Sequence, residues 1–149
     1  MEGERPNIVQ KFVSDAGRGL EMVMIITKNL PLAPGESLSI DELREILSPA
    51  QLKEMLPQGA TLIGAKSTSI EGVPAGMLEY RLQQERAGIS LSMQFVSYIF
   101  FSGATMVQLQ CGVTIGQSTS IAALSQRMKE FKPLFFLMAN SIVLQDKWK

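Results

Sequence analysis

Residues 89–115 read ISLSMQFVSYIFFSGATMVQLQCGVTI, and two features of this stretch predict a β-hairpin. Apolar side chains recur at every second position on both sides of a central Ser-Gly, as expected of strands with one buried face. A short segment containing glycine between two such runs is typical of a tight turn. We therefore expect antiparallel strands over 89–101 and 105–115, closing at Ser102 and Gly103.

The register of this hairpin follows from its odd-numbered apolar residues if all of them face one core. A two-residue loop at 102 and 103 would pair Phe95 with Gln110 and place the two apolar sets on opposite faces. A three-residue loop over 102–104 pairs Phe95 with Cys111 and keeps both sets together, and a slip by one residue would turn them away. The sequence thus predicts an odd-length loop or a bulge, with Gly103 at positive φ.

The same register gathers a second apolar group on the opposite face of the hairpin. This candidate binding patch consists of Val96, Tyr98, Phe100, Met106 and Gln108. An exposed apolar patch with a polar fringe marks a surface for a protein partner or an apolar ligand. The alternative is that a second layer covers it, either the N-terminal hairpin, a helix or another copy of the chain, because layered folds often bury both faces of a sheet.

Further strands are predicted around this hairpin. The alternation at 61–70 and 77–86, separated by a turn with glycine and proline, extends it into a four-strand antiparallel meander. Residues 8–14 and 20–27 flank the turn signal DAGRG and predict an N-terminal hairpin.

Helices are predicted in two places. Ser39 and Glu42 have the spacing of a capping box, and Ser48 before Pro49 repeats the start signal, so a helix pair or one bent helix is expected up to residue 56. From 121 to 142 apolar residues recur at steps of three and four, which predicts a helix that Pro133 kinks. The tail 143–149 is expected to be irregular. The predicted fold is α+β, a single domain over 1–149 in which helices pack on both faces of an antiparallel sheet (an α/β/α sandwich).

The composition excludes several classes of function. The chain has 149 residues, 14 basic and 14 acidic side chains, no histidine and one cysteine. Without histidine there is no Ser-His-Asp triad, no Cys-His dyad and no zinc site of the histidine type. A net charge of zero argues against nucleic-acid binding, because affinity for phosphate backbones comes mainly from clustered lysine and arginine. The longest apolar-leaning stretch, 89–101, is too short for a transmembrane segment.

Few individual residues are candidates for chemistry. Glu79 and Arg81 share one face of a strand and are expected to form an exposed ion pair. Cys111 lies in an alternating strand pattern without a basic neighbour, which predicts a buried thiol. Trp148 either anchors the tail or stays outside the fold. No residue is assigned to catalysis, to a cofactor or to a metal, so a non-catalytic role is favoured over an enzymatic one.

Three stretches resemble the PsbP-like superfamily, which includes bacterial DcrB-type envelope proteins. They are GATLIGAKSTSIEGVPAGMLEYRL, SMQFVSYIFFSGATMVQLQCGV and FKPLFFLMANSIVL, and the resemblance covers about residues 60 to 143. The similar points are the Gly-x-Pro-Ala turn of 72–75 with its strand ending at Tyr80, the Tyr-x-Phe-x-x-Gly hairpin of 98–103, and the Asn-Ser-Ile of 140–142 near the helix end.

The resemblance implies an α/β/α sandwich and a non-catalytic binding or assembly module of a bacterial cell envelope. Its place would be periplasmic or membrane-anchored through a removed signal, with a cytoplasmic place as the alternative. No functional residue of the family carries over, and the metal-binding histidines of some photosynthetic members have no counterpart. The expected partner is a protein or an apolar ligand on a sheet face or in a sheet–helix groove, with homodimerisation left open. The alternative function is a small-ligand carrier or small enzyme with a pocket between helix and sheet.

Overall fold

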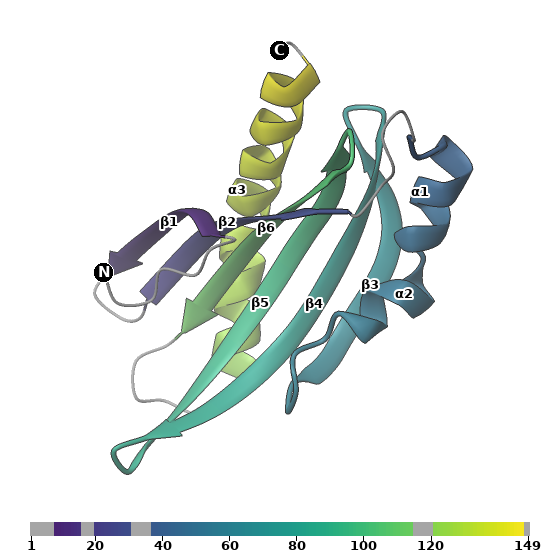
Figure 1. Ribbon diagram of the computed structural model, residues 1–149. Coiled ribbons are helices and arrows are strands. Elements are labelled where there is room, and N and C mark those ends of the chain that lie inside the picture. The colour runs from purple at the N-terminus through teal and green to yellow at the C-terminus, as the bar shows by residue number, and fades with distance from the viewer. Residues whose placement is uncertain (1–7, 16–19, 31–36, 115–120, 148–149) are drawn as a thin grey trace.

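The computed structural model describes residues 8–15, 20–30, 37–114 and 121–147, and six strands within these ranges form one antiparallel sheet (Figure 1). Its order is β1-β2-β6-β5-β4-β3. The strands are β1 (Ile8–Asp15), β2 (Leu20–Asn29), β3 (Thr61–Ile70), β4 (Val73–Arg86), β5 (Ile89–Ser102) and β6 (Thr105–Thr114). The N-terminal hairpin and the four-strand meander are both confirmed, and the pairing of β2 with β6 joins them into one sheet.

Helices cover both faces of this sheet. The short helices α1 (Ile40–Ile46) and α2 (Pro49–Glu54) lie on one face, and the long helix α3 (Ile121–Lys147) crosses the other (Figure 1). The capping box of α1 is present, since the Ser39 hydroxyl accepts the Glu42 N–H and the Glu42 carboxylate accepts the Ser39 N–H. The Ser48 hydroxyl caps α2 in the predicted way. The predicted sandwich of helices around an antiparallel sheet is therefore confirmed.

Helix α3 runs for 27 residues and continues through Pro133. Its buried stripe follows the predicted apolar positions except at Ile121, which is exposed. Leu124, Met128 and Phe135 are buried against the sheet, and Phe131, Met138 and Ile142 pack partly buried against the same core. Ala139 and Val143 are also buried there. The expectation of an irregular tail from residue 143 was wrong, because Val143 continues the stripe and is buried against the sheet. Trp148 lies outside the described residues.

The register of β5 and β6 also differs from the prediction. Ser102 pairs with Thr105, so the loop consists of two residues, Gly103 and Ala104, one position further along than the two-residue loop considered. Phe95 consequently lies opposite neither Gln110 nor Cys111 but opposite Gly112. Gly103 does have the expected positive φ, 59°.

The reason is that β5 has a packed layer on each side. Its even-numbered residues Val96, Tyr98 and Phe100 face α3 together with the odd-numbered apolar residues of β6. Its odd-numbered residues Ile99 and Phe101 pack against the α1–α2 side. The assumption that all odd-numbered residues share one core does not hold in a three-layer fold, because each apolar set has a layer of its own.

Gly112 supplies a local reason for the observed register. A Cβ atom at this position would lie 2.5 Å from Cε1 of Phe95, so only glycine leaves room for that ring above the β6 backbone. The Phe95 ring stacks on Tyr80 at a centroid distance of 5.3 Å. A shift of the register by one residue would place Cys111 or Val113 opposite Phe95 in place of Gly112. The space that the Phe95 ring occupies is therefore present only in the observed register.

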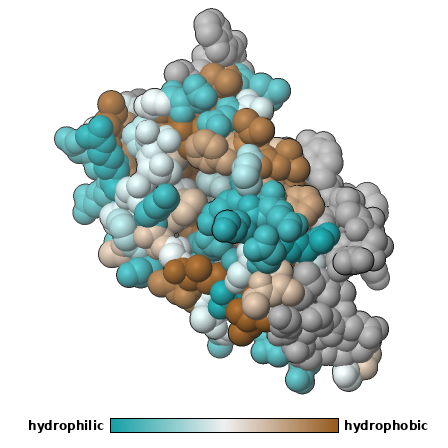
Figure 2. All heavy atoms as spheres, turned by 180° about the vertical axis from the view of Figure 1, so that it is seen from behind, coloured by the Kyte–Doolittle hydropathy of each residue, from teal (hydrophilic) through white to brown (hydrophobic). Residues whose placement is uncertain are grey.

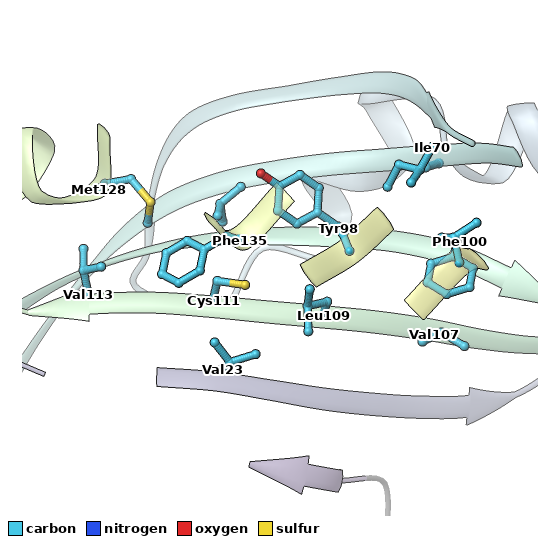
Figure 3. Close-up of a cluster of buried hydrophobic side chains, with 14 of the residues drawn as sticks. Val23, Ile70, Tyr98, Phe100, Val107, Leu109, Cys111, Val113, Met128 and Phe135 are labelled. Atoms are coloured by element: carbon cyan, nitrogen blue, oxygen red, sulfur yellow. The ribbon is translucent and has the colours of Figure 1, made fainter. Parts of the chain in front are cut away.

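Within the described residues, apolar side chains form one buried cluster under α3 and two on the α1–α2 side. The core under α3 is partly shown in Figure 3, and its sheet residues include Val23, Ile70, Val107, Leu109, Cys111 and Val113. One cluster on the α1–α2 side contains Leu47 and Leu52, with Ile99 and Phe101 beneath them. Among the described helices, including α3, none has an apolar run long enough to cross a membrane.

Candidate functional site

The candidate binding patch is divided between the two faces of the sheet. Val96, Tyr98 and Phe100 are buried under α3, with at most 2% of each residue exposed. Met106 and Gln108 point to the α1–α2 side, because they pair across the strands with odd-numbered residues of β5. The exposed patch expected at the hairpin is therefore absent from these five residues. For the three buried ones the structure has the covering layer that was the alternative.

The glutamines expected at the fringe of that patch form internal hydrogen bonds. Gln108 Nε2 donates to Ser97 Oγ at 3.1 Å, and Gln110 Nε2 donates to the Tyr80 hydroxyl at 2.6 Å. Both glutamines are partly buried, and a polar group removed from water without a partner costs free energy. These glutamines therefore connect β5, β6 and β4 within the fold.

A cleft of about 560 Å³ opens on the α3 side of the sheet, next to the buried part of the patch. It exists because α3 packs chiefly over β5 and β6 and leaves the β3–β4 side of that face less covered. We call it the α3 cleft, and its lining residues are Lys66, Thr68, Met77, Tyr98, Lys129, Lys132, Pro133 and Phe136. Figure 2 shows the molecule from this side, where hydrophilic and hydrophobic residues lie next to one another.

Cross-strand pairing forms the floor of the α3 cleft. Lys66 of β3 lies opposite Met77 of β4, and Met77 lies opposite Tyr98 of β5, so these three residues form one row across the sheet. Their side chains share a face because directly opposed residues in an antiparallel pair point the same way. The floor is thus apolar at its centre and basic at the outer strand.

Helix α3 supplies the opposite wall. Phe136 contacts Tyr98 edge to face, with ring centroids 5.9 Å apart and an angle of 62° between the rings. Phe136 remains 40% exposed, so its ring has a free surface as well as a packed one. The apolar repeat that predicts the helix over 121–142 does not include Phe136. This residue lies beside the row of positions that face the sheet.

A buried polar network lies beside the cleft and corrects the prediction for Glu79 and Arg81. Glu79 is only 7% exposed and pairs with Lys132, not with Arg81. Lys132 Nζ donates to Glu79 Oε1 at 2.6 Å, and Gln94 Nε2 donates to Glu79 Oε2 at 2.7 Å. Both carboxylate oxygens thus have a partner, as a buried charge requires.

Arg81 belongs to the same network through neutral partners. Its Nε donates to Gln94 Oε1 at 3.3 Å and its terminal nitrogen donates to Ser125 Oγ at 3.0 Å. Gln94 therefore lies between the two charged residues, which is why they do not meet directly. No local pattern marks the partner of Glu79, since Lys132 is 53 residues away in the sequence.

Two titratable side chains on this face are held protonated. Burial raises the pKa of the Tyr98 hydroxyl well above its usual range, and the neighbouring Cys111 and Glu79 raise it further. Burial also raises the pKa of the Cys111 thiol to about 12. The prediction of a buried cysteine is confirmed, since Cys111 is fully buried. Neither a phenolate nor a thiolate is therefore available here at neutral pH.

Two solved structures are similar to this chain along most of its length. One is a protein of unknown function from Pseudomonas aeruginosa, for which a regulatory role has been suggested, with 16% identity, a TM-score of 0.47, and coverage of 93% of this chain and 84% of that one. The other is cyanobacterial PsbP (CyanoP) from Synechocystis, with 13% identity, a TM-score of 0.44, and coverage of 93% and 82%. Neither a family model nor a curated protein sequence matches the chain. In the described part of the chain, no three acidic, cysteine or histidine residues gather as a metal site.

Proposed function

We propose that this protein is a non-catalytic binding module that takes its partner in the α3 cleft. The observation that carries the proposal is the cleft itself, in which Met77, Tyr98 and Phe136 form an apolar surface between two basic walls. Binding sites are typically concave and mostly apolar, with a few polar groups that orient the bound molecule. Of the two surfaces expected from the sequence, a sheet face and a sheet–helix groove, the cleft supports the groove.

The chemistry of the nearby side chains supports binding over catalysis. A general base or nucleophile needs a pKa near the working pH, whereas burial holds the Tyr98 hydroxyl and the Cys111 thiol protonated. The Glu79 carboxylate is occupied by Lys132 and Gln94. The Lys132–Glu79 pair connects α3 to β4 beside the cleft, and these groups favour binding over the alternative of a small enzyme.

The place of the protein in the cell is a second part of the proposal. The three stretches that resemble PsbP-like proteins support a module of a bacterial cell envelope, of the DcrB type, in the periplasm or anchored to a membrane. This location can be tested by fractionating the bacterial cells that naturally make the protein and detecting the chain in each fraction with an antibody. Recovery in the periplasmic or membrane fraction supports it, and recovery with cytoplasmic markers contradicts it.

A photo-crosslinking amino acid tests the binding surface directly. p-Benzoylphenylalanine placed at Phe136 reports molecules in the α3 cleft, and the same group at Ile40 is the control, because Ile40 is 58% exposed on the opposite side of the sheet. We expect an adduct at position 136 and none at position 40 after irradiation of intact cells. Its mass distinguishes a protein partner, a second copy of the chain and a small molecule. Adducts from position 40 alone would refute the cleft as the binding surface.

A further inference from the structure

We infer that the α3 cleft takes a small organic anion with an apolar body, such as a carboxylate that carries an alkyl or aromatic group. This inference rests on the proposed function, because it names the class of molecule that would occupy the same cleft. The charge at the rim, the apolar floor and the size of the cleft all favour this class of molecule.

The charge at the rim is positive. Lys66 lies on the strand wall, while Lys129 and Lys132 lie on the helix wall, so ammonium groups stand on both sides of the opening. Lys132 is already neutralised by Glu79 at 2.6 Å. Among the described residues, neither Lys66 nor Lys129 pairs with a carboxylate, and both are exposed. Two positive charges therefore remain to attract an anion.

The floor suits an apolar body. Met77 and Tyr98 lie beneath the opening, and Pro133 and Phe136 supply apolar surface from the helix. Methionine adapts to ligands of different shape, because its side chain is unbranched and polarizable. Thr68 adds one hydroxyl beside this surface. A molecule that places its charge between the lysines can thus bury its apolar part against these side chains.

The size of the space favours a small molecule. The volume of about 560 Å³ lies within the range of roughly 300–1,000 Å³ that is usual for small-molecule pockets. A wholly polar anion would leave the apolar floor uncovered, and a neutral apolar molecule would leave both lysines without a counter-charge. The amphipathic anion is the class that satisfies both parts of the cleft.

Binding of three eight-carbon probes separates these classes. Octanoate, 1-octanol and octylammonium are titrated below their aggregation limits, and the chemical shifts of Met77, Tyr98 and Phe136 are followed by NMR. We expect octanoate to shift these signals at the lowest concentration, with an affinity that falls as salt is added. Octanol should bind more weakly, and octylammonium weakest.

A pair of double variants tests the role of the lysines. Lys66→Gln with Lys129→Gln should weaken octanoate binding about tenfold, as expected for the loss of two exposed charge contacts. The matched control is Lys28→Gln with Lys53→Gln, which removes the same charge from exposed lysines outside the cleft. We expect the control to bind octanoate like the original chain.

The outcomes separate the inference from the proposed function. Equal binding of octanol and octanoate at the cleft, unaffected by the lysine variants, overturns the inference but retains the cleft as a binding surface. Stronger binding of octylammonium overturns it in the same way. If no probe shifts the cleft signals, the inference is wrong, and the crosslinking result at position 136 still decides the proposed function on its own.

Discussion

Lys132 Nζ lies 2.6 Å from Glu79 Oε1, so a residue of the C-terminal helix neutralises a buried carboxylate on the inner strand β4. Because Gln94 occupies the second carboxylate oxygen, the loss of Lys132 would leave Glu79 buried with one neutral partner. This pair connects α3 to β4 at the edge of the α3 cleft, and its contribution to stability can be measured.

Replacement of Lys132 by Met should lower the free energy of unfolding by about 2–3 kcal/mol. Removing one member of a buried pair costs about 3–5 kcal/mol, and the half-exposed Lys132 places this pair below that range. Urea denaturation measures the effect. The double variant with Glu79→Gln should recover most of the loss, whereas a double variant less stable than Lys132→Met alone would contradict the interpretation.

Replacement of Gly112 by Ala should destabilise the protein by about 1–3 kcal/mol, because the added methyl group meets the Phe95 ring. Gly64→Ala is the matched control on an outer strand, since a Cβ atom there has no neighbour within 4 Å. We expect that control to change stability by less than about 0.5 kcal/mol. Equal effects of the two substitutions in urea denaturation would show that the Phe95–Gly112 pairing is wrong.

Replacement of Phe136 by Ala should cost about 1 kcal/mol through the lost ring contact with Tyr98. Leu137 is the control, because it follows directly on the same helix and is 62% exposed. Leu137→Ala should leave thermal stability nearly unchanged. Phe136→Ala should also weaken octanoate binding, and an unchanged affinity would remove Phe136 from the binding surface.

The raised pKa of Cys111 predicts how stability depends on pH. The thiol has a pKa of about 9 in the unfolded chain and about 12 in the folded one. Between these pH values the unfolded chain loses the thiol proton while the folded chain keeps it. Its contribution to stability is therefore complete below pH 9 and is lost as the pH rises toward 12. The free energy of unfolding should decline over this range, and less steeply in Cys111→Ala.

The same thiol should resist chemical modification. At pH 8 a thiol reagent should react with Cys111 only after the chain opens, because the folded thiol is buried and protonated. The rate should rise sharply in urea. Rapid labelling of the native protein would contradict the burial of Cys111 under α3.

Local signals in the sequence predicted much of the fold. The capping box at Ser39 and Glu42 acts within one turn, and the turns of the meander depend on adjacent residues, so both can be recognised without knowledge of the rest. The register of β5 and β6 could not be found in this way. Residues 98–101 are apolar toward both faces, and an alternation that satisfies two cores does not distinguish between neighbouring registers.

The candidate site depended on contacts distant in sequence and was predicted least well. The sequence predicts Tyr98 in an exposed patch, whereas in the structure it is buried beneath α3 and lines the floor of the cleft. The sequence does not identify three further residues of the cleft, Lys66, Lys129 and Phe136. Each is an ordinary surface or helix residue in the sequence, and only the packing of α3 beside β3 brings them together. The position of a long helix on a sheet is set by the whole packed face, and no short motif encodes it.

The strand order has a consequence for the order of events in folding. The meander from β3 to β6 can form from neighbouring segments, whereas β2 must pair with a strand that is made some eighty residues later, as the Asn29–Thr105 contact across 76 positions illustrates. Contacts between distant segments form slowly, because closing a long loop costs entropy before any contact repays it. We therefore expect the N-terminal hairpin to join the sheet late in folding, and until then the edge of β6 stays unpaired.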